Sequence, residues 1–143
     1  MIIRKYQSSD CNAMIALFHE TIHTTNRKDY TLEQCEAWSD GYRDLEQWDR
    51  SFRAHTTLVA FQDRRIIAFG DIDSNGYLDR LFVHQDYQKQ GVGTALCELL
   101  EECVEGDITT QASITAKPFF LQRGYRVRKE QEVIRQGVRL KKI

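Results

Sequence analysis

Six residues near the middle of the chain, Gln88-Lys89-Gln90-Gly91-Val92-Gly93, have the composition of an anion-binding turn. An apolar segment, 77–83, precedes them, and an amphipathic pattern begins at Val92. A glycine-rich turn at the start of a helix presents backbone N–H groups that have no partner within the helix, at the positive end of the helix dipole. The stretch therefore predicts a site for a phosphate-bearing ligand.

Two common phosphate-binding motifs do not fit these residues. A mononucleotide P-loop requires Lys followed by Ser or Thr directly after its last glycine, whereas Gly93 is followed by Thr94 and Ala95. A Rossmann fingerprint requires a third small residue where Leu96 stands, and an acidic residue about twenty positions later. A nucleotide-binding domain that uses the same loop is therefore only a third hypothesis. Taken alone, the Gly-x-Gly sequence is also typical of a plain structural turn.

The loop resembles the Q/R-x-x-G-x-G/A signature of the GNAT superfamily of acyl-CoA-dependent N-acetyltransferases. The preceding Leu81-Phe82-Val83 is similar to the cofactor strand of that family. Residues 116–125, with the sequence AKPFFLQRGY, are similar to its later A-x-x-F-Y-x-x-x-G-F segment. The resemblance implies that acetyl-CoA is the cofactor and that the protein is an enzyme, an N-acetyltransferase.

The resemblance also implies how the chain binds coenzyme A. Backbone N–H groups of the loop would hold the pyrophosphate, and glycine would be required where a side chain blocks close approach. Backbone groups of Leu81 and Val83 would pair with pantetheine, and the Val83 N–H could polarise the thioester carbonyl. Ser113 stands where many members carry an Asn. The implied cofactor-binding residues are Leu81, Phe82, Val83, Gln88, Lys89, Gln90, Gly91, Val92, Gly93, Thr94, Ser113, Phe119 and Phe120.

Transfer to an amine requires a base, because an alkyl ammonium must lose a proton before it can act as a nucleophile. The candidates are Asp79, within segment 77–83, and Asp71, directly after the apolar segment 66–70. A carboxylate inside an apolar strand is either catalytic or paired, here with Arg80 or Arg123. For Asp71, a solvated charge at a strand end is an equal alternative.

The usual proton donor of the family is absent. Many members carry a tyrosine at the second aromatic position, where this chain has Phe120. Tyr125 is the replacement that we place first, ahead of Tyr77, Tyr30 and His84, and water could also protonate the departing thiolate. The missing tyrosine motivates a second hypothesis, a non-catalytic acyl-CoA-binding sensor or regulatory domain.

The acceptor region of the family corresponds to the end of the first helix and the start of the second. We expect the substrate-binding residues to be His23, Asp29, Tyr30 and Trp38. Imidazole, carboxylate and aromatic groups together suit a small polar or cationic amine. A protein amino group is the alternative acceptor. A histidine at a helix end is also a common capping residue, and a tryptophan often fills the core.

The hydrophobic period predicts the elements that position these residues. Apolar residues at helical spacing predict helices after Ser8 or Ser9, after Thr31, from Asp44 to Phe52, after Gly91 and from Thr115 to Gln122. Strands are expected at 1–6, 57–61, 66–70, 77–83, 108–113, 125–134 and 138–143, with a last turn at Gln136-Gly137. This order agrees with a single GNAT-like α/β (α+β) domain over 1–143. The family implies a mixed, mostly antiparallel central sheet of about seven strands with helices on both faces.

Composition limits the kinds of partner, location and metal site that we expect for the protein. The chain has 20 basic and 21 acidic residues, so we expect no nucleic-acid partner. It has no apolar run of about 20 residues and no signal-peptide core, so we expect a cytoplasmic protein without a membrane partner. The four cysteines lack C-x-x-C spacing, which favours buried thiols and no metal site. A homodimer through the last strands is left open.

Overall fold

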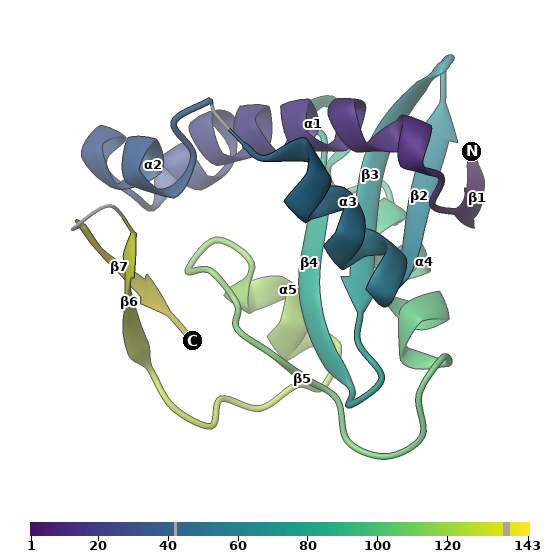
Figure 1. Cartoon of the computed structure of the whole chain (residues 1–143). Coiled ribbons are helices and arrows are strands. Elements are labelled where there is room, and N and C mark those ends of the chain that lie inside the picture. Colours follow the sequence, from purple (N-terminus) through teal and green to yellow (C-terminus); the bar gives the residue numbers. More distant parts are fainter. Residues whose placement is uncertain (42, 136–137) are drawn as a thin grey trace.

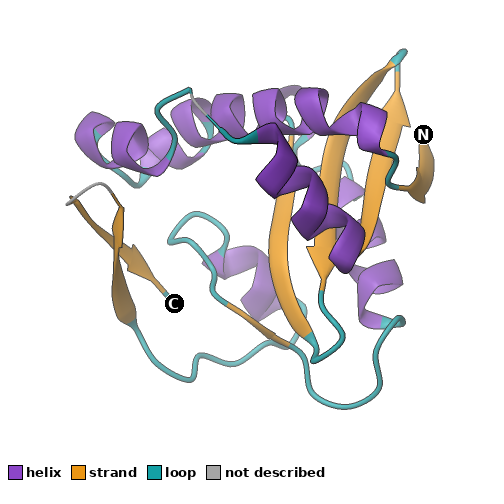
Figure 2. Cartoon of the chain, viewed as in Figure 1, coloured by secondary structure: helices purple, strands orange, loops and turns teal. Residues whose placement is uncertain are grey.

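The structure, a computed structural model, describes residues 1–41, 43–135 and 138–143. A five-stranded sheet and a separate two-stranded hairpin are combined with helices that lie across the larger sheet (Figures 1 and 2). The elements in chain order are β1 (Ile2–Lys5), η1 (Ser8–Asp10), α1 (Cys11–Thr24), η2 (Asn26–Lys28), α2 (Leu32–Trp38), α3 (Leu45–Ala54), β2 (Thr56–Gln62), β3 (Arg65–Ile72), β4 (Tyr77–Val83), η3 (Gln85–Tyr87), α4 (Val92–Glu101), β5 (Thr109–Thr110), α5 (Lys117–Gln122), β6 (Gln131–Arg135) and β7 (Val138–Lys142).

The large sheet has the strand order β1-β2-β3-β4-β5, antiparallel throughout except for the parallel pair of β4 and β5. The mixed, mostly antiparallel sheet was predicted, but the expectation of about seven strands in one sheet was wrong. The described residues contain seven strands, and within them the last two, β6 and β7, pair with each other as a hairpin. The hairpin is joined to the segment after β5 by mutual backbone hydrogen bonds between Ala112 and Ile143, at 2.7 and 2.8 Å.

Helices cover both faces of the large sheet, as expected. On one face, α1 and α3 bury Met14, Phe18 and Phe52 against Phe69 and other strand residues. On the other face, Val92 and Leu96 of α4 pack against Ala60 of β2 and against β3. Figure 1 shows α1 and α3 in front of the strands, α4 behind them and α5 beside β4. The strands are apolar on both sides because both sides are covered.

The predicted start signals of α2 and α3 are confirmed. The side chain of Thr31 accepts a hydrogen bond from the Gln34 N–H, and Gln34 returns one to Thr31, which is the expected capping box. Asp44 caps α3 through the Gln47 N–H. The helix α3 also contributes the buried Phe52 to the core.

The later elements are shorter than predicted. The strand expected over 108–113 is reduced to Thr109–Thr110, which pair with Tyr77 and Leu78 before the two strands separate. The strand expected from Tyr125 begins only at Gln131. The predicted turn at Gln136-Gly137 lies outside the described residues. Across the described ranges, no helix is both long enough and apolar enough to span a membrane.

Candidate active site

A cleft of about 1240 Å³ opens where β4 and β5 separate. All but one of the predicted cofactor-binding residues line it; Gln90 does not, because its side chain donates to the Asp86 carbonyl at 3.3 Å. The cleft continues past Asp79 to the inner sides of α2 and α3. One continuous space therefore connects the predicted anion loop with the region expected to bind the acceptor.

The part of β4 that lies beyond its pairing with β5 presents backbone groups to this cleft. The N–H of His84, directly after β4, donates to the Ile67 carbonyl of β3 at 2.8 Å. Successive residues of a strand direct their backbone groups to opposite edges, so those of Val83 face away from β3, toward the gap. The Val83 carbonyl there accepts a hydrogen bond from the Gln88 side chain at 2.6 Å.

The anion loop has the backbone conformation that its glycines permit. Gly91 has φ +82° and forms the N-cap of α4 without a side-chain hydrogen bond, so the first N–H groups of the helix are directed outward. A Cβ added at Gly93 would lie 3.4 Å from the Phe119 ring, which is an ordinary van der Waals contact, so packing within the protein does not by itself require glycine there.

Ser113 and Phe120 are placed at the cleft, with contacts of their own. The Oγ of Ser113 accepts hydrogen bonds from the Asn26 side chain at 3.3 Å and from the Ala116 N–H at 3.0 Å. It is buried and fixes the turn that leads into α5. The Phe120 ring is packed edge-on against Phe119, so its core-packing role is present whatever else it contacts.

A β-bulge places the candidate base. Asp71 of β3 pairs with Arg80 and Ile72 pairs with Leu78, so Asp79 is the extra residue of β4. A bulge interrupts the regular alternation of side chains and can redirect one of them. Asp79 lines the cleft, and its Oδ2 accepts a hydrogen bond from Arg80 at 3.1 Å. The expected pairing of Asp79 with Arg80 is confirmed, and Asp79 is the only carboxylate among the described residues that line the cleft.

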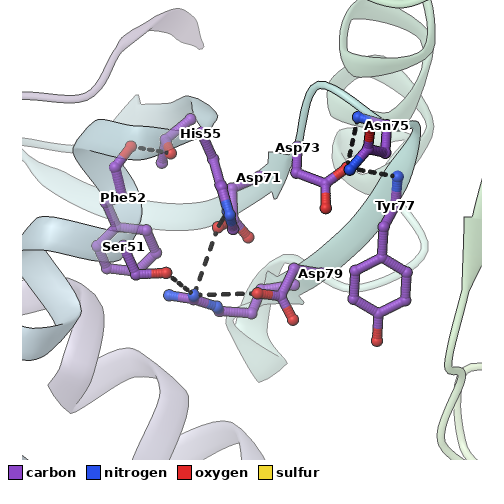
Figure 3. A network of polar contacts seen from close by, with 10 residues as sticks. Ser51, Phe52, His55, Asp71, Asp73, Asn75, Tyr77 and Asp79 are labelled. Carbon is purple, nitrogen blue, oxygen red and sulfur yellow. Dashed lines mark hydrogen bonds and ion pairs between the residues drawn. The ribbon is translucent and has the colours of Figure 1, made fainter.

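Asp71, the other candidate base, lies behind this surface. Its side chain is 0% exposed and does not line the cleft. One of its oxygens lies 2.8 Å from Nδ1 of His55 and 3.6 Å from the Arg80 guanidinium (Figure 3). The hydrogen bond to Asp71 raises the pKa of His55, so the imidazolium form is favoured. Asp71 therefore does not reach a ligand in the cleft, and instead forms an ion pair with Arg80.

Arg80 occupies the centre of this network. It also donates to the Ser51 hydroxyl and lies over the Phe52 ring, with 4.5 Å between guanidinium carbon and ring centroid. His55, Asp71 and Asp79 bring three potential metal ligands within 4.8 Å of one another. The guanidinium supplies the positive charge at that position, so the cluster is a set of ion pairs built around an arginine.

Tyr125, predicted as the proton donor, is not brought to the cleft. Its hydroxyl donates to Glu101 at 2.6 Å, and Arg123 binds the same carboxylate. Burial and the hydrogen bond to Glu101 raise the pKa of Tyr125 far above its usual range. Of the other tyrosines considered, Tyr77 lines the cleft, whereas Tyr30 does not and its hydroxyl oxygen accepts a hydrogen bond from the Ile114 N–H at 2.8 Å.

The predicted acceptor residues are divided among different places. Trp38 lines the cleft, and the buried Tyr30 packs edge-on against it with 5.3 Å between ring centroids. His23 faces a second hollow, where its Nε2 donates to the Ser39 carbonyl at 2.6 Å. Asp29 is exposed and does not line the cleft. Only Trp38 of this group is therefore in position to contact an acceptor.

Sequence reasoning missed most of the acceptor wall. It is formed by Arg43, Gln47 and Trp48 in and before α3, and by Arg135 at the end of β6. The guanidinium groups of Arg80 and Arg43 lie over the Trp48 ring, at 5.0 and 5.9 Å from its centroid. The available signal was the spacing of Trp48 and Phe52, which places both aromatics on one face of α3.

Comparison with known proteins agrees with this geometry. The family model described as an acetyltransferase (GNAT) domain matches residues 26–142. The chain belongs to the GNAT acetyltransferase family. It is 33% identical over 131 residues to the uncharacterized N-acetyltransferase YafP of Escherichia coli, covering 92% of this chain and 85% of that protein. These matches identify the protein as an acetyl-CoA-dependent acetyltransferase.

Solved structures show the same fold. A GCN5-related N-acetyltransferase from Rhodopseudomonas palustris superposes on this acetyltransferase with a TM-score of 0.93 at 30% identity, covering 99% of this chain and 91% of that one. The N-acetyltransferase PaiA of Thermoplasma acidophilum, solved with coenzyme A, has a TM-score of 0.70 at 18% identity, covering 99% and 96%. YncA of Salmonella typhimurium, solved with acetyl-CoA, has a TM-score of 0.69 at 15% identity, covering 99% and 90%.

Proposed function

We propose that this acetyltransferase transfers the acetyl group of acetyl-CoA to a primary amine of a small molecule, by direct attack in a ternary complex. One observation carries the proposal: the Gly91 loop, the free edge of β4 and Asp79 follow one another along a single cleft. A pocket for one small ligand has about 300–1,000 Å³, so a volume of about 1240 Å³ suits two substrates bound together.

The start of α4 supports binding of the coenzyme A pyrophosphate. This helix has ten residues, and its first N–H groups and dipole face the cleft beside Gly91. The Lys89 side chain adds a positive charge at the same end of the cleft. Farther along, the backbone of Leu81 and Val83 can pair with the pantetheine arm as an added strand would.

Acetyl-CoA, when bound, supplies the acetyl group as a thioester. The Val83 N–H, directed into the gap beside β4, can donate to the acyl carbonyl oxygen and stabilise negative charge on it. Asp79 accepts a proton from the acceptor ammonium, directly or through one water molecule. Arg80 orients that carboxylate through the 3.1 Å hydrogen bond, and Asp71 holds Arg80 in place.

The proton for the departing thiolate has one side-chain source at the acceptor end of the cleft. Tyr77 lies two residues before Asp79, and burial raises its pKa, so its hydroxyl remains protonated at neutral pH. Tyr125 is bound to Glu101, and Phe120 has no proton to donate. We therefore assign the role to Tyr77, with water as the alternative donor, since a thiolate is a good leaving group.

Ligand binding and turnover are tested separately. A ligand present at about 100 Kd raises the free energy of unfolding by about 2.7 kcal/mol, so acetyl-CoA and desulfo-coenzyme A should both raise Tm, and ATP should not. Thiol release is then measured across a panel of primary amines and lysine-containing peptides. Preference for the free amines supports the small-molecule acceptor; preference for peptides would establish a protein amino group instead.

A sensor that binds acetyl-CoA without turnover is the second candidate function, favoured by Phe120 in place of the usual tyrosine. It predicts a Tm increase with acetyl-CoA and no thiol release with any amine. Thiol release that is lost in Asp79→Asn would exclude it.

A further inference from the structure

Two histidines of α1 lie next to each other outside the cleft. His19 and His23 line the second hollow, which has a volume of about 580 Å³, and neither of them lines the cleft. Residues four apart in a helix are neighbours on its surface, and the two ring centroids are 4.4 Å apart. A pair of histidines at this spacing on one face of a helix can bind one zinc ion together.

The buried Ser39, directly after α2, holds both imidazole rings. Its carbonyl accepts a hydrogen bond from His23 Nε2 at 2.6 Å, so Nε2 carries the proton and Nδ1 of that ring keeps a lone pair. The Ser39 Oγ lies 2.7 Å from His19 Nδ1 and can accept a hydrogen bond from it, which leaves a lone pair on His19 Nε2. Histidines that bind metal almost always donate their other ring N–H to such a partner, which fixes the tautomer and the ring orientation.

The surroundings of His19 favour its neutral form. Burial lowers the pKa of His19, with a further lowering by His23 and Arg43 and an opposing effect of Asp40. A histidine must be neutral to bind a metal ion, because the ion takes the lone pair that a proton would otherwise occupy. The ring is therefore both oriented and in the required protonation state at neutral pH.

The neighbouring helix α2 brings carboxylates to the same hollow (Figure 1). Glu33 and Glu36 both line it, are exposed, and lie three residues apart on α2. No described carboxylate oxygen is close enough to form a compact set of three ligand atoms with both rings, so one of these glutamates must change its rotamer to join them. Imidazole nitrogens with a carboxylate oxygen are a common ligand set for Zn²⁺, whereas Mg²⁺ and Ca²⁺ prefer oxygen ligands.

We propose that His19 and His23 bind a divalent transition-metal ion such as Zn²⁺, and that Glu33 or Glu36 completes the site from α2. The ion would join α1 to α2 beside Trp38, the last residue of α2, which lines the cleft. This inference does not depend on the proposed function. It departs from the sequence-based expectation of no metal site, which was drawn from the spacing of the cysteines alone.

The first test measures zinc binding. Isothermal titration of zinc chloride into the metal-free full chain should show a single strong site, and Zn²⁺ but not Mg²⁺ should raise Tm. His19→Gln and His23→Gln should each lower the zinc affinity by more than about tenfold, and Ser39→Ala by about tenfold, through the orientation of His19. No strong site in the original protein, or an equal response to Mg²⁺, would overturn the inference.

Further variants locate the ion. The double variant Glu33→Gln, Glu36→Gln changes two exposed positions, so it should stay folded and still bind zinc more weakly. Cys103→Ser and His55→Gln are the matched controls, because they remove the exposed thiol and a histidine of the cluster around Arg80. An unchanged Tm increase with desulfo-coenzyme A shows that each variant is folded. Zinc affinity that is lost in either control, or retained in His23→Gln, would overturn the assignment.

The imidazole nitrogens give a direct measurement that requires no variant and no turnover. The chain has four histidines, so their long-range ¹H–¹⁵N NMR signals can be assigned individually. In the metal-free protein, His23 should be protonated at Nε2 and unprotonated at Nδ1. Stoichiometric Zn²⁺ should shift His23 Nδ1 and His19 Nε2 and leave His55 and His84 unchanged. Shifts at His55 or His84 instead, or no shift at any ring, would overturn the inference.

Discussion

The two ends of the cleft are made from different parts of the chain and from different chemical groups. At the coenzyme A end, the loop from Gln88 to Gly93 and the adjacent edge of β4 offer mainly backbone groups from one continuous segment. At the other end, side chains from α2, α3, β4 and β6 line the cleft. The first end needs only a local backbone conformation, whereas the second depends on packing between segments far apart in sequence.

This difference explains which residues are free to vary. Backbone N–H groups are present in every residue except proline, so the coenzyme A end needs glycine only where the backbone requires it, as at Gly91. The other end is lined mainly by side chains, so their identity determines its chemistry. Enzymes with the same coenzyme A site can therefore act on different amines.

The largest effect is expected where the two ends meet. Asp79→Asn keeps the size of the side chain and removes its ability to accept a proton, so kcat/KM should fall by roughly 10²- to 10⁴-fold. Acetyl-CoA affinity, measured by titration calorimetry, should be retained, because the anion loop is unchanged. Activity within a few-fold of the original protein would mean that a water molecule or another group is the base.

The backbone character of the coenzyme A end is tested by a pair of glycines. Gly91 and Gly106 have similar positive φ angles, +82° and +89°, and neither has an atom within 4 Å of an added Cβ. Alanine at either position should therefore lower the free energy of unfolding by about 1–2 kcal/mol. Only Gly91→Ala should also weaken coenzyme A binding, by about tenfold, because it displaces the first N–H groups of α4. Equal affinities in the two variants would argue against the anion site.

The sequence predicted the coenzyme A end better than the acceptor end, because only the first is built from one continuous segment. The strand, turn and helix around Gly91 are adjacent in the chain, so the spacing of their residues is enough to predict how they are arranged. Asp79 could be proposed but not distinguished from Asp71, because the bulge that makes Asp79 the extra residue arises from the pairing of β3 with β4. The position of Arg43 at the cleft could not be predicted locally, because its guanidinium packs on Phe18 and Trp48, which come from two different helices.

Tyr125→Phe tests whether the predicted proton donor acts from outside the cleft. The hydroxyl binds Glu101 in a partly buried position, so its removal should cost about 1–2 kcal/mol of unfolding free energy. The value of kcat should stay within roughly twofold, whereas Tyr77→Phe, on the cleft, should lower kcat further. A large loss of kcat in Tyr125→Phe, measured well below the Tm of the variant, would mean that Tyr125 is the proton donor.

The smallest expected effect is on the free energy of unfolding, through the His55–Asp71 pair behind the cleft, and it depends on pH. The Asp71 carboxylate raises the pKa of His55, so protonated His55 stabilises the folded protein. This contribution is fully present below the unfolded pKa of about 6.5 and is lost as pH rises through the higher folded pKa. His55→Gln should therefore cost on the order of 1 kcal/mol at pH 5.5, and the difference from the original protein should shrink at higher pH.

Two measurements check this pH dependence. Urea unfolding at several pH values gives the difference between the two proteins, and the imidazole NMR shifts of His55 give its pKa directly. Arg80 contacts the same Asp71 oxygen and also binds Asp79 directly, so the orientation of Asp79 should not change with His55. A difference in stability that grows with pH would show that His55 is neutral in the folded protein, and Asp71 would then depend on Arg80 alone for its charged partner.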